Sequence, residues 1–298
     1  MPEPQASDSA SNTKGTIAVT GVTGSQGSAA ARALLDRGWS VRGLTRNPEG
    51  DVARVLAGEG VSLLKGDMDR RVDLEALFDG VRGAYVVTDF FQNGIDGELR
   101  QGKLMADVAA ASGVSHYVYA SVIGAERGTG IPHFDSKFEV EQHIDASGLA
   151  ATILRPGVFM EDLTEKKYVP PAGWGMMGKL TGTNTPLPWI AVEDIGAIAA
   201  IVLDDAAKFT GKKIPLATDE KTLDEARAIF RAVDGKNPFK ISMPTWIFRK
   251  WVSEDLVIMW EYFGNHRIEA PVETTRSLHP EALGMEAWLR KKRAGPSG

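Results

Sequence analysis

Short apolar runs alternate with segments of helical periodicity through the first half of the chain. The apolar runs predict buried strands at 16–20, 39–45, 61–65, 83–87, 115–120 and 150–154. The segments between them place apolar residues on one helical face and predict helices at 25–37, 51–57, 72–78, 97–111 and 134–146. Because apolar strands separated by helices are typical of a parallel sheet covered on both faces, the pattern predicts an α/β fold with a Rossmann-type doubly wound parallel sheet.

The rhythm breaks after Arg155. Residues 170–188 are rich in Gly, Pro and Thr and predict a long loop, of the kind that often carries function. Beyond it, the pattern predicts helices at 192–204, 223–233, 244–262 and 280–291 and a possible strand at 213–217. We therefore expect a tail at 1–14, a Rossmann domain at 15–155 to which the helix at 192–204 returns, and a smaller C-terminal α+β domain at 156–298.

Composition narrows the class of protein. The chain has 298 residues, 43% of them hydrophobic and 24% charged, as in ordinary soluble globular proteins. Its net charge of −5 provides no bulk attraction to nucleic acid, and no run approaches the ~18 apolar residues of a membrane helix. The absence of cysteine excludes disulfides and thiol nucleophiles. Residues 1–14 lack the apolar stretch of a signal peptide, so we expect a soluble, cytoplasmic protein with a disordered N-terminal tail.

A glycine-rich segment joins the first strand to the first helix. It reads Gly21-Val-Thr23-Gly24-Ser25-Gln26-Gly27. The first glycine permits a tight turn, the second lets a pyrophosphate approach the backbone, and the third lets the helix pack on the strand, while the helix N-terminus presents N–H groups to the anion. Three glycines alone are a weak signal, but at this place in a βαβ unit they predict a dinucleotide-binding loop.

The end of the second strand bears on which nucleotide is bound. Folds that prefer NAD usually carry an acid there for the ribose 2′-hydroxyl, whereas this chain has Thr45-Arg46-Asn47. Arg46 can clamp a 2′-phosphate, with Thr45 and Asn47 as neutral donors, so the sequence favours NADP(H); a solvated loop arginine is the alternative. After the third strand, Asp67 could accept from the adenine amino group, and Asp69 could equally be a helix N-cap.

Together these segments resemble the NmrA-like family of atypical short-chain dehydrogenases/reductases, and in particular its branch of NADPH-sensor proteins. The resemblance extends from residue 16 to about residue 292 and is carried by Gly21–Gly27, Thr45–Pro48, Gly66–Asp69, Val86–Thr88, His133–Lys137 and Glu139–Glu141. The glycine motif is typical of the superfamily, while the His133–Lys137 segment is similar to the sensor branch.

The resemblance implies a set of cofactor contacts. The glycine loop would hold the pyrophosphate. The other implied contacts are Thr45, Arg46, Asn47, Asp67, Met68, Thr88, Phe90, Lys137, Pro156, Val158 and Phe159. The residues up to Met68 would serve the adenosine half and the later ones the nicotinamide half, where Lys137 would hydrogen-bond the ribose. Simple core packing is the alternative for Phe90 and Phe159.

The usual catalytic pair of the superfamily is altered in this chain. Typical members use Tyr-x-x-x-Lys on a helix, where the phenol protonates the substrate as hydride arrives. Here His133 stands at the tyrosine position, Lys137 is kept, and Ser121 takes the place of the superfamily's serine. His133 could donate a proton near neutral pH, or could be a residue of the helix start after Pro132, and Ser121 could simply end a strand.

Two classes of function therefore stay open. The missing tyrosine favours a redox-responsive regulator that senses NADPH/NADP⁺ with weak or no turnover and binds a protein partner, in the cytoplasm or also in the nucleus. The 170–188 segment, with Trp246, Trp251 and Trp260, is instead compatible with the pocket of an NADPH-dependent oxidoreductase for a small apolar carbonyl or quinone. The histidines show no metal-ligand spacing, and neither a membrane nor direct nucleic-acid contact is expected; the pattern leaves the oligomeric state open.

Overall fold

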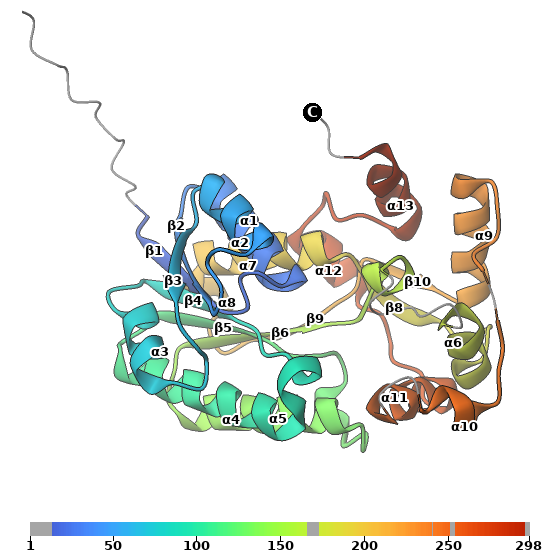
Figure 1. The fold of residues 1–298 in the computed structure, drawn as a ribbon, viewed down its shortest axis with the longest axis horizontal. Helices are drawn as coiled ribbons and strands as arrows, with labels where there is room; N and C mark the ends of the chain where they lie inside the picture. The colour runs from blue at the N-terminus through green and yellow to red at the C-terminus, as the bar shows by residue number, and fades with distance from the viewer. Residues whose placement is uncertain (1–13, 166–172, 240, 251–253, 296–298) are drawn as a thin grey trace, which may run out of the picture.

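The computed structural model describes residues 14–165, 173–239, 241–250 and 254–295. Within them, seven parallel strands form one sheet in the order β3-β2-β1-β4-β5-β6-β9 (Figure 1). These strands are β1 Thr16–Val19, β2 Ser40–Thr45, β3 Ser62–Lys65, β4 Gly83–Val86, β5 His116–Ala120, β6 Ala151–Pro156 and β9 Lys213–Leu216. The doubly wound α/β fold predicted from the sequence is confirmed. The tail expected at 1–14 lies outside the described residues, apart from Lys14.

Helices cover both faces of the large sheet. One face is packed by α1 Ser25–Asp36, α2 Asp51–Gly58 and α7 Val192–Asp204. The other face is packed by α3 Arg71–Phe78, α4 Phe90–Ala111 and α5 Pro132–Ala146. Helix α7 lies so close to α1 that a Cβ on Gly196 would be 2.5 Å from the carbonyl carbon of Ala29. The central strands β1, β4, β5 and β6 are therefore buried between two helical layers, which is why most of their residues are apolar, whereas none of the four residues of the edge strand β3 is buried.

Helix α4 begins earlier than the sequence predicts. The helical pattern starts at residue 97, but the helix itself starts at Phe90, directly after β4. The Asp89 carboxylate caps it by accepting a hydrogen bond from the Phe91 N–H at 2.9 Å. Gly94 then interrupts the helix with a φ of +68°, so residues 90–93 form a separate turn. The Asp89 cap and Gly94 define this turn, and the spacing of apolar residues in the sequence does not predict it.

The described residues after β6 add a smaller α+β unit with a three-stranded sheet in the order β10-β8-β7, of which Figure 1 labels β8 and β10. Its strands are β7 Val158–Phe159, β8 Leu187–Ile190 and β10 Asp219–Lys221. The remaining helical elements are η1 Ala125–Arg127, η2 Met160–Leu163, α6 Gly173–Thr181, α8 Ala206–Phe209, α9 Leu223–Asp234, α10 Thr245–Phe248, α11 Glu254–Asn265, α12 Val272–Leu278 and α13 Met285–Ala294. A second apolar core that includes Trp189, Trp260 and Phe263 holds this unit together.

The prediction of a loop at 170–188 is wrong for residues 173–188, which contain α6 and the start of β8. Residues 170–172 lie outside the described residues. Three large apolar side chains explain the difference. Trp174, Met176 and Met177 are all buried, so their packing fixes a helix in a segment whose glycine content disfavours one.

Other elements of this half also differ from the sequence pattern. The strand predicted at 213–217 exists as β9, but it pairs with β6 in the large sheet instead of belonging to the smaller unit. The helix predicted at 244–262 is divided into α10 and α11. The helix predicted at 280–291 begins only at Met285, and α12 has no counterpart in the prediction. In the described part of the chain, no helix combines the length and the apolar character needed to cross a membrane.

Candidate functional site

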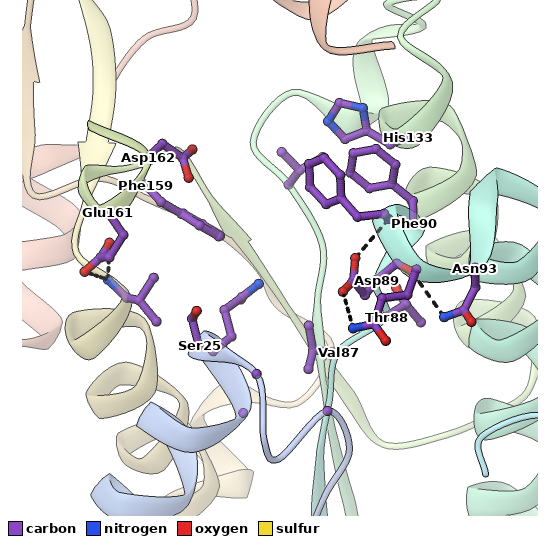
Figure 2. A pocket seen from close by; sticks show the side chains of 18 of the residues that line it. Ser25, Val87, Thr88, Asp89, Phe90, Asn93, His133, Phe159, Glu161 and Asp162 are labelled. Atoms are coloured by element: carbon purple, nitrogen blue, oxygen red, sulfur yellow. Dashed lines mark hydrogen bonds between the residues drawn. The ribbon is translucent and has the colours of Figure 1, made fainter. Parts of the chain in front are cut away.

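A cavity of about 810 Å³ runs along the carboxyl ends of the parallel strands (Figure 2). Every site residue singled out from the sequence lines it: Gly21, Thr23, Gly24, Ser25, Gln26, Gly27, Thr45, Arg46, Asn47, Asp67, Met68, Thr88, Phe90, Ser121, His133, Lys137, Pro156, Val158 and Phe159. Most of them directly follow a strand of the large sheet. Since the carboxyl ends of parallel strands meet at one edge, segments far apart in the chain converge there.

The glycine loop is shaped by close contacts. Gly21 has a φ of +57°, and a Cβ there would be 2.8 Å from a methyl group of Val87. A Cβ on Gly27 would be 2.2 Å from the carbonyl oxygen of Gly21, so this glycine lets α1 pack on the loop. A Cβ on Gly24 would meet only the Gly21 oxygen, at 3.2 Å. Gly24 is the N-cap of α1, and no described side chain caps that end. The helix N-terminus therefore offers its N–H groups to an anion in the cavity.

Arg46 directly follows β2 and lines the cavity. Its guanidinium donates a hydrogen bond to the Gln92 side-chain oxygen at 2.5 Å, which links the end of β2 to the first turn of α4. Gln92 in turn donates to the Asp89 carboxylate at 2.9 Å. The Thr45 hydroxyl accepts from the Asn47 N–H at 3.3 Å. No acid stands at the end of β2 itself, and the Arg46 guanidinium can hold a phosphate there.

Asp69 is not a helix N-cap, so that interpretation of the sequence is wrong. The N-cap of α3 is Arg70, and Asp69 instead accepts hydrogen bonds from Arg100 at 2.9 Å and Gln101 at 2.8 Å. Burial raises the pKa of Asp69, but the bonds from Gln101 and Arg100 outweigh it and leave the pKa below its ordinary value of 3.8. Asp67 accepts from the Asp69 N–H at 3.0 Å, which shapes the turn beside the cavity.

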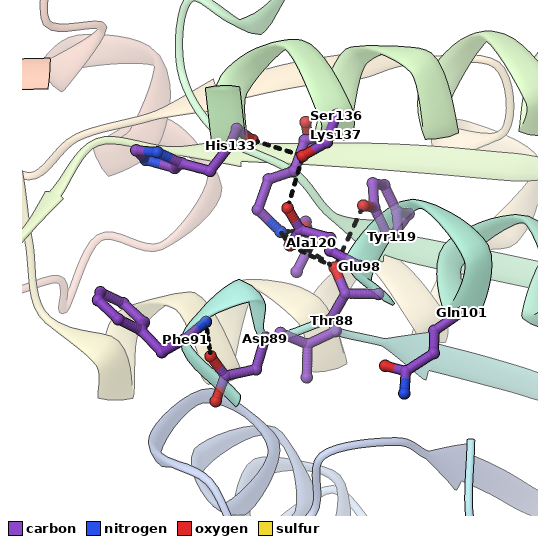
Figure 3. A network of polar contacts seen from close by, with 12 residues as sticks. Thr88, Asp89, Phe91, Glu98, Gln101, Tyr119, Ala120, His133, Ser136 and Lys137 are labelled. Carbon is purple, nitrogen blue, oxygen red and sulfur yellow. Dashed lines mark hydrogen bonds and ion pairs between the residues drawn. The ribbon is translucent and has the colours of Figure 1, made fainter. Parts of the chain in front are cut away.

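Lys137 is held by a buried carboxylate that the sequence does not single out (Figure 3). Its ammonium lies 2.8 Å from an oxygen of Glu98, which is fully buried in α4, and donates to the Thr88 hydroxyl at 3.2 Å. Glu98 also accepts from Thr88 at 2.8 Å and from Ser136 at 2.7 Å. Burial raises the pKa of Glu98, but Lys137 and these donors bring it below its ordinary value. The sequence signal that could have identified Glu98 is a glutamate on the apolar face of a predicted helix.

His133 is also held by a residue that the sequence does not reveal. Its Nδ1 contacts the carboxylate of Asp255 on α11, which also accepts from the His133 backbone N–H at 3.0 Å. The imidazole stacks on Phe90 with ring centroids 4.5 Å apart. Because α5 begins at Pro132, His133 is both a first-turn residue and part of the cavity wall. Asp255 is 122 positions away, so no local pattern links the two.

Ser121 lines the cavity, but its hydroxyl forms a hydrogen bond with a residue behind the cavity wall. It donates to Glu141 of α5, a fully buried carboxylate. Glu141 also accepts from the guanidinium of Arg155 at 3.0 Å. Ser121 therefore belongs to a buried ionic network behind the wall, and in this arrangement its proton points away from the cavity.

Part of the cavity lining is apolar, and we call this part the apolar chamber. Its apolar wall consists of Val122, Ile123, Phe134, Met177, Phe248, Leu256, Met259, Trp260 and Phe263. Of the tryptophans expected in a pocket, Trp260 lines the chamber, Trp246 is 64% exposed and is not part of the wall, and Trp251 lies outside the described residues. The chamber can accommodate an apolar ligand beside the residues expected around a nicotinamide.

The apolar chamber also contains carboxyl groups from η2 and the residues after it. Glu161 accepts from the Val192 N–H at 3.2 Å and from the Trp288 indole at 3.2 Å, so it joins α7 and α13 to this wall. Burial, reinforced by the carboxylates of Glu161 and Glu165, raises the pKa of Asp162 to about 8. The sequence does not single out these acids, because an acidic stretch after a strand usually indicates a solvated turn.

Comparison with known proteins gives a match over most of the chain. A family model described as the NmrA-like family matches residues 13–289. An NmrA-like family domain-containing oxidoreductase of Aspergillus japonicus is 32% identical over 227 residues, which are 68% of this chain and 68% of that protein. Another, from Aspergillus versicolor, is 29% identical over 249 residues, 73% of this chain and 68% of that protein. The nitrogen metabolite repression protein of Neurospora crassa is 29% identical over 278 residues, 77% of this chain and 56% of that protein.

Solved structures show the same fold. NmrA, a negative transcriptional regulator in complex with NADP, has a TM-score of 0.74 at 22% identity and covers 95% of this chain and 98% of its own. The NADPH-dependent quinone oxidoreductase QOR2 of Escherichia coli, complexed with NADPH, has a TM-score of 0.74 at 19% identity and covers 91% of this chain and 96% of its own.

Proposed function

The chain belongs to the NmrA-like family, and on that basis we propose that it binds NADP(H) and uses it to reduce a small apolar carbonyl or quinone. The observation that carries this proposal is the continuity of the cavity, in which the residues expected around the nicotinamide border the apolar chamber. A mostly apolar cavity of this kind is typical of sites that bind small molecules. Relatives named as oxidoreductases support the same reading.

The residues of the nucleotide half fit NADP(H). Gly24 leaves open the space above the N-terminus of α1, where a pyrophosphate would accept hydrogen bonds from backbone N–H groups. Arg46 would hold the 2′-phosphate, and Lys137 the ribose of the nicotinamide. Bound NADPH would supply the hydride, and the protein would contribute its position and a water-poor environment.

The experiment that tests the proposed function is NADPH oxidation, followed at its absorbance, with 9,10-phenanthrenequinone and a panel of apolar ketones. We expect turnover with at least one of them. A protein that binds NADPH tightly and oxidises none of these compounds would disprove the reductase proposal and leave the nucleotide-binding proposal intact.

Arg46→Ala is expected to weaken NADPH binding and to leave NADH binding almost unchanged, because NADH lacks the 2′-phosphate. Hydrogen bonds to a charged group contribute about 1.5–3 kcal/mol, which corresponds to about a 10- to 100-fold loss of affinity. Titration of both nucleotides by intrinsic fluorescence would measure this. Arg54→Ala is the matched control, since Arg54 is an exposed arginine on α2 that contacts Glu49 at 3.6 Å. Equal wild-type affinities for the two nucleotides would contradict the assignment of Arg46.

A specific contact favours a second candidate, a sensor of the NADPH/NADP⁺ ratio that binds a protein partner in the cytoplasm or nucleus. A bound 2′-phosphate competes with Gln92 for the Arg46 guanidinium, and Gln92 belongs to the turn that Gly94 separates from the rest of α4. Because NADPH and NADP⁺ both carry the 2′-phosphate, either nucleotide would change the contacts of this turn, and a sensor of their ratio would have to distinguish them at the nicotinamide end. The name of the Neurospora crassa relative agrees with a regulatory role.

We expect amide hydrogen exchange at residues 89–94 to slow when NADPH binds, because the turn exchanges its contact with Arg46 for contacts with the nucleotide. Exchange measured by mass spectrometry with saturating NADPH, NADP⁺ or no ligand would show this. A sensor requires the two nucleotide states to differ in protection, since a ligand shifts only an equilibrium whose states it distinguishes. Identical protection across the protein with NADPH and with NADP⁺ would rule out the sensor candidate, whatever the ligand-free sample shows.

A further inference from the structure

The altered catalytic pair leaves the source of the substrate proton unassigned. Lys137 is in an ion pair with buried Glu98, and the Ser121 hydroxyl donates to Glu141. Glu161 accepts hydrogen bonds from the Val192 N–H of α7 and from the Trp288 indole of α13. These groups line the cavity near the nicotinamide end, but each is already engaged by the protein.

Glu165 is paired with Lys292, so the titratable groups of the apolar chamber that remain are His133 and Asp162. The imidazole of His133 is covered by Phe90 on one face and has its Nδ1 against Asp255. Asp162 belongs to η2, which follows Phe159 directly. Figure 2 shows Asp162 and Phe159 on one side of the cavity, opposite Phe90 and His133. No described residue hydrogen-bonds the Asp162 carboxyl, although it lines the cavity.

The surroundings of Asp162 favour the protonated form of its carboxyl. Burial, with the carboxylates of Glu161 and Glu165 on the same stretch, raises its pKa to about 8. Among the described residues, the charged or titratable groups around this stretch include Asp194 of α7, which interacts electrostatically with Glu161, and Lys292 of α13, whose ammonium lies 3.9 Å from Glu165. His133 faces it from across the cavity. Lys292 pairs with Glu165, and the raised pKa of Asp162 favours its protonated carboxyl at neutral pH.

We propose that the carboxyl of Asp162 donates the proton to the substrate oxygen, the role that a tyrosine has in typical short-chain reductases; the proposal rests on the reductase function proposed above. The substrate carbon accepts a hydride from NADPH, the C=O π electrons move to the oxygen, and that oxygen accepts the Asp162 proton. The products are the alcohol, NADP⁺ and the Asp162 carboxylate, which regains a proton from water. A quinone is reduced to its hydroquinone with the same balance of one hydride and one proton.

This assignment also defines the substrate class. A neutral carboxyl donates to a carbonyl oxygen, whereas the nearby carboxylates Glu161 and Glu165 repel an anion. The chamber is therefore built for neutral ketones and quinones, and substrates that carry a carboxylate or phosphate next to the reacting carbon are excluded.

A binding experiment tests the assignment without turnover. Benzophenone, a ketone that does not titrate, is bound to the protein saturated with NADP⁺, and its affinity is measured by calorimetry between about pH 6 and pH 10. We expect constant affinity up to about pH 8 and a fall of up to about tenfold per pH unit above it, as the donor loses its proton. Asp162→Asn should bind benzophenone at all pH values, because the amide N–H still donates a hydrogen bond to the ketone oxygen. Asp162→Leu should bind benzophenone weakly at every pH.

The second arm measures kcat and KM with NADPH and 9,10-phenanthrenequinone. Asp162→Asn has no proton to give, so kcat should fall about 10²- to 10⁴-fold with nearly unchanged KM. Glu165→Gln is the matched variant, since it removes one neighbouring carboxylate and should shift the midpoint of the pH profile downward while Asp162 stays in place. His133→Gln should reduce kcat far less than Asp162→Asn.

The outcomes separate this inference from the reductase proposal. If the wild type consumes no NADPH, the reductase proposal fails, and the pH dependence of benzophenone binding alone decides whether Asp162 is a proton-bearing donor. The inference is overturned if benzophenone does not bind, if its pH dependence persists in Asp162→Asn, or if that variant keeps its kcat within about tenfold. A loss of kcat confined to His133→Gln would assign the proton to the histidine instead.

Discussion

Replacing Gly24 with valine is expected to abolish NADP(H) binding while the protein stays folded. The backbone of Gly24 has φ −85° and ψ 170°, which valine adopts without strain, and its Cβ would meet only one protein atom within 4 Å. The remaining methyl groups would then occupy the space where the pyrophosphate meets the N-terminus of α1. Losing two charge-assisted hydrogen bonds, at about 1.5–3 kcal/mol each, predicts a loss of affinity of more than about 100-fold.

Two other glycines serve as controls for this variant. Gly27→Val should prevent folding, because its Cβ would lie 2.2 Å from the Gly21 oxygen and 2.5 Å from the Gly21 carbonyl carbon. Gly58→Ala should be neutral, because a Cβ there meets nothing within 4 Å. NADPH titration by fluorescence and thermal unfolding by circular dichroism would compare all three. A folded Gly24→Val protein with wild-type affinity would refute the loop assignment.

Glu98→Ala is expected to destabilise the protein by about 3–5 kcal/mol, because it leaves the Lys137 ammonium buried without its partner. Urea unfolding would measure the change. The double variant Glu98→Leu/Lys137→Met should recover most of the loss, since no uncompensated charge remains. The control is the exposed pair between Lys103 and Glu139, which joins the same two helices at 2.6 Å. Glu139→Ala should cost no more than about 1 kcal/mol, and an equal loss in both variants would contradict this account.

The same ion pair predicts how stability depends on pH. The pKa of Glu98 in the folded protein lies below its ordinary value of 4.5. The pair therefore contributes fully above pH 4.5, and its contribution disappears as the pH falls through the folded pKa. Urea unfolding free energies of the wild type should fall on acidification in that range, and those of Glu98→Gln should fall less steeply. An equal fall in unfolding free energy for the two proteins on acidification would contradict the lowered pKa of Glu98.

Much of the nucleotide half was predictable from the sequence, because its signals are local. Each strand from β1 to β6 is a short apolar run, and each helix between them repeats apolar residues at helical spacing. The phosphate loop follows from glycines at 21, 24 and 27 between a strand and a helix. The convergence of the predicted site residues on one cavity required only the rule that parallel strands present their carboxyl ends at one edge.

Local signals were insufficient where packing decided the outcome. The glycine-rich segment around Trp174 and Met177 is a helix because those side chains are buried in the smaller unit. The strand β9 joins the large sheet through its pairing with β6, a partner about 60 residues earlier in the chain. Sequence pattern identifies which residues avoid water, but not which distant element covers them.

The polar groups of the site show the same division. The sequence identified His133 and Lys137 by their place in a motif, but only the tertiary structure showed that Asp255 holds the first and Glu98 the second. Asp162 acquires its raised pKa from burial and from neighbouring carboxylates in the folded chain. The type and order of residues determined what this protein can bind, whereas the charge, proton and orientation of each group were decided by contacts that exist only after distant segments have packed together.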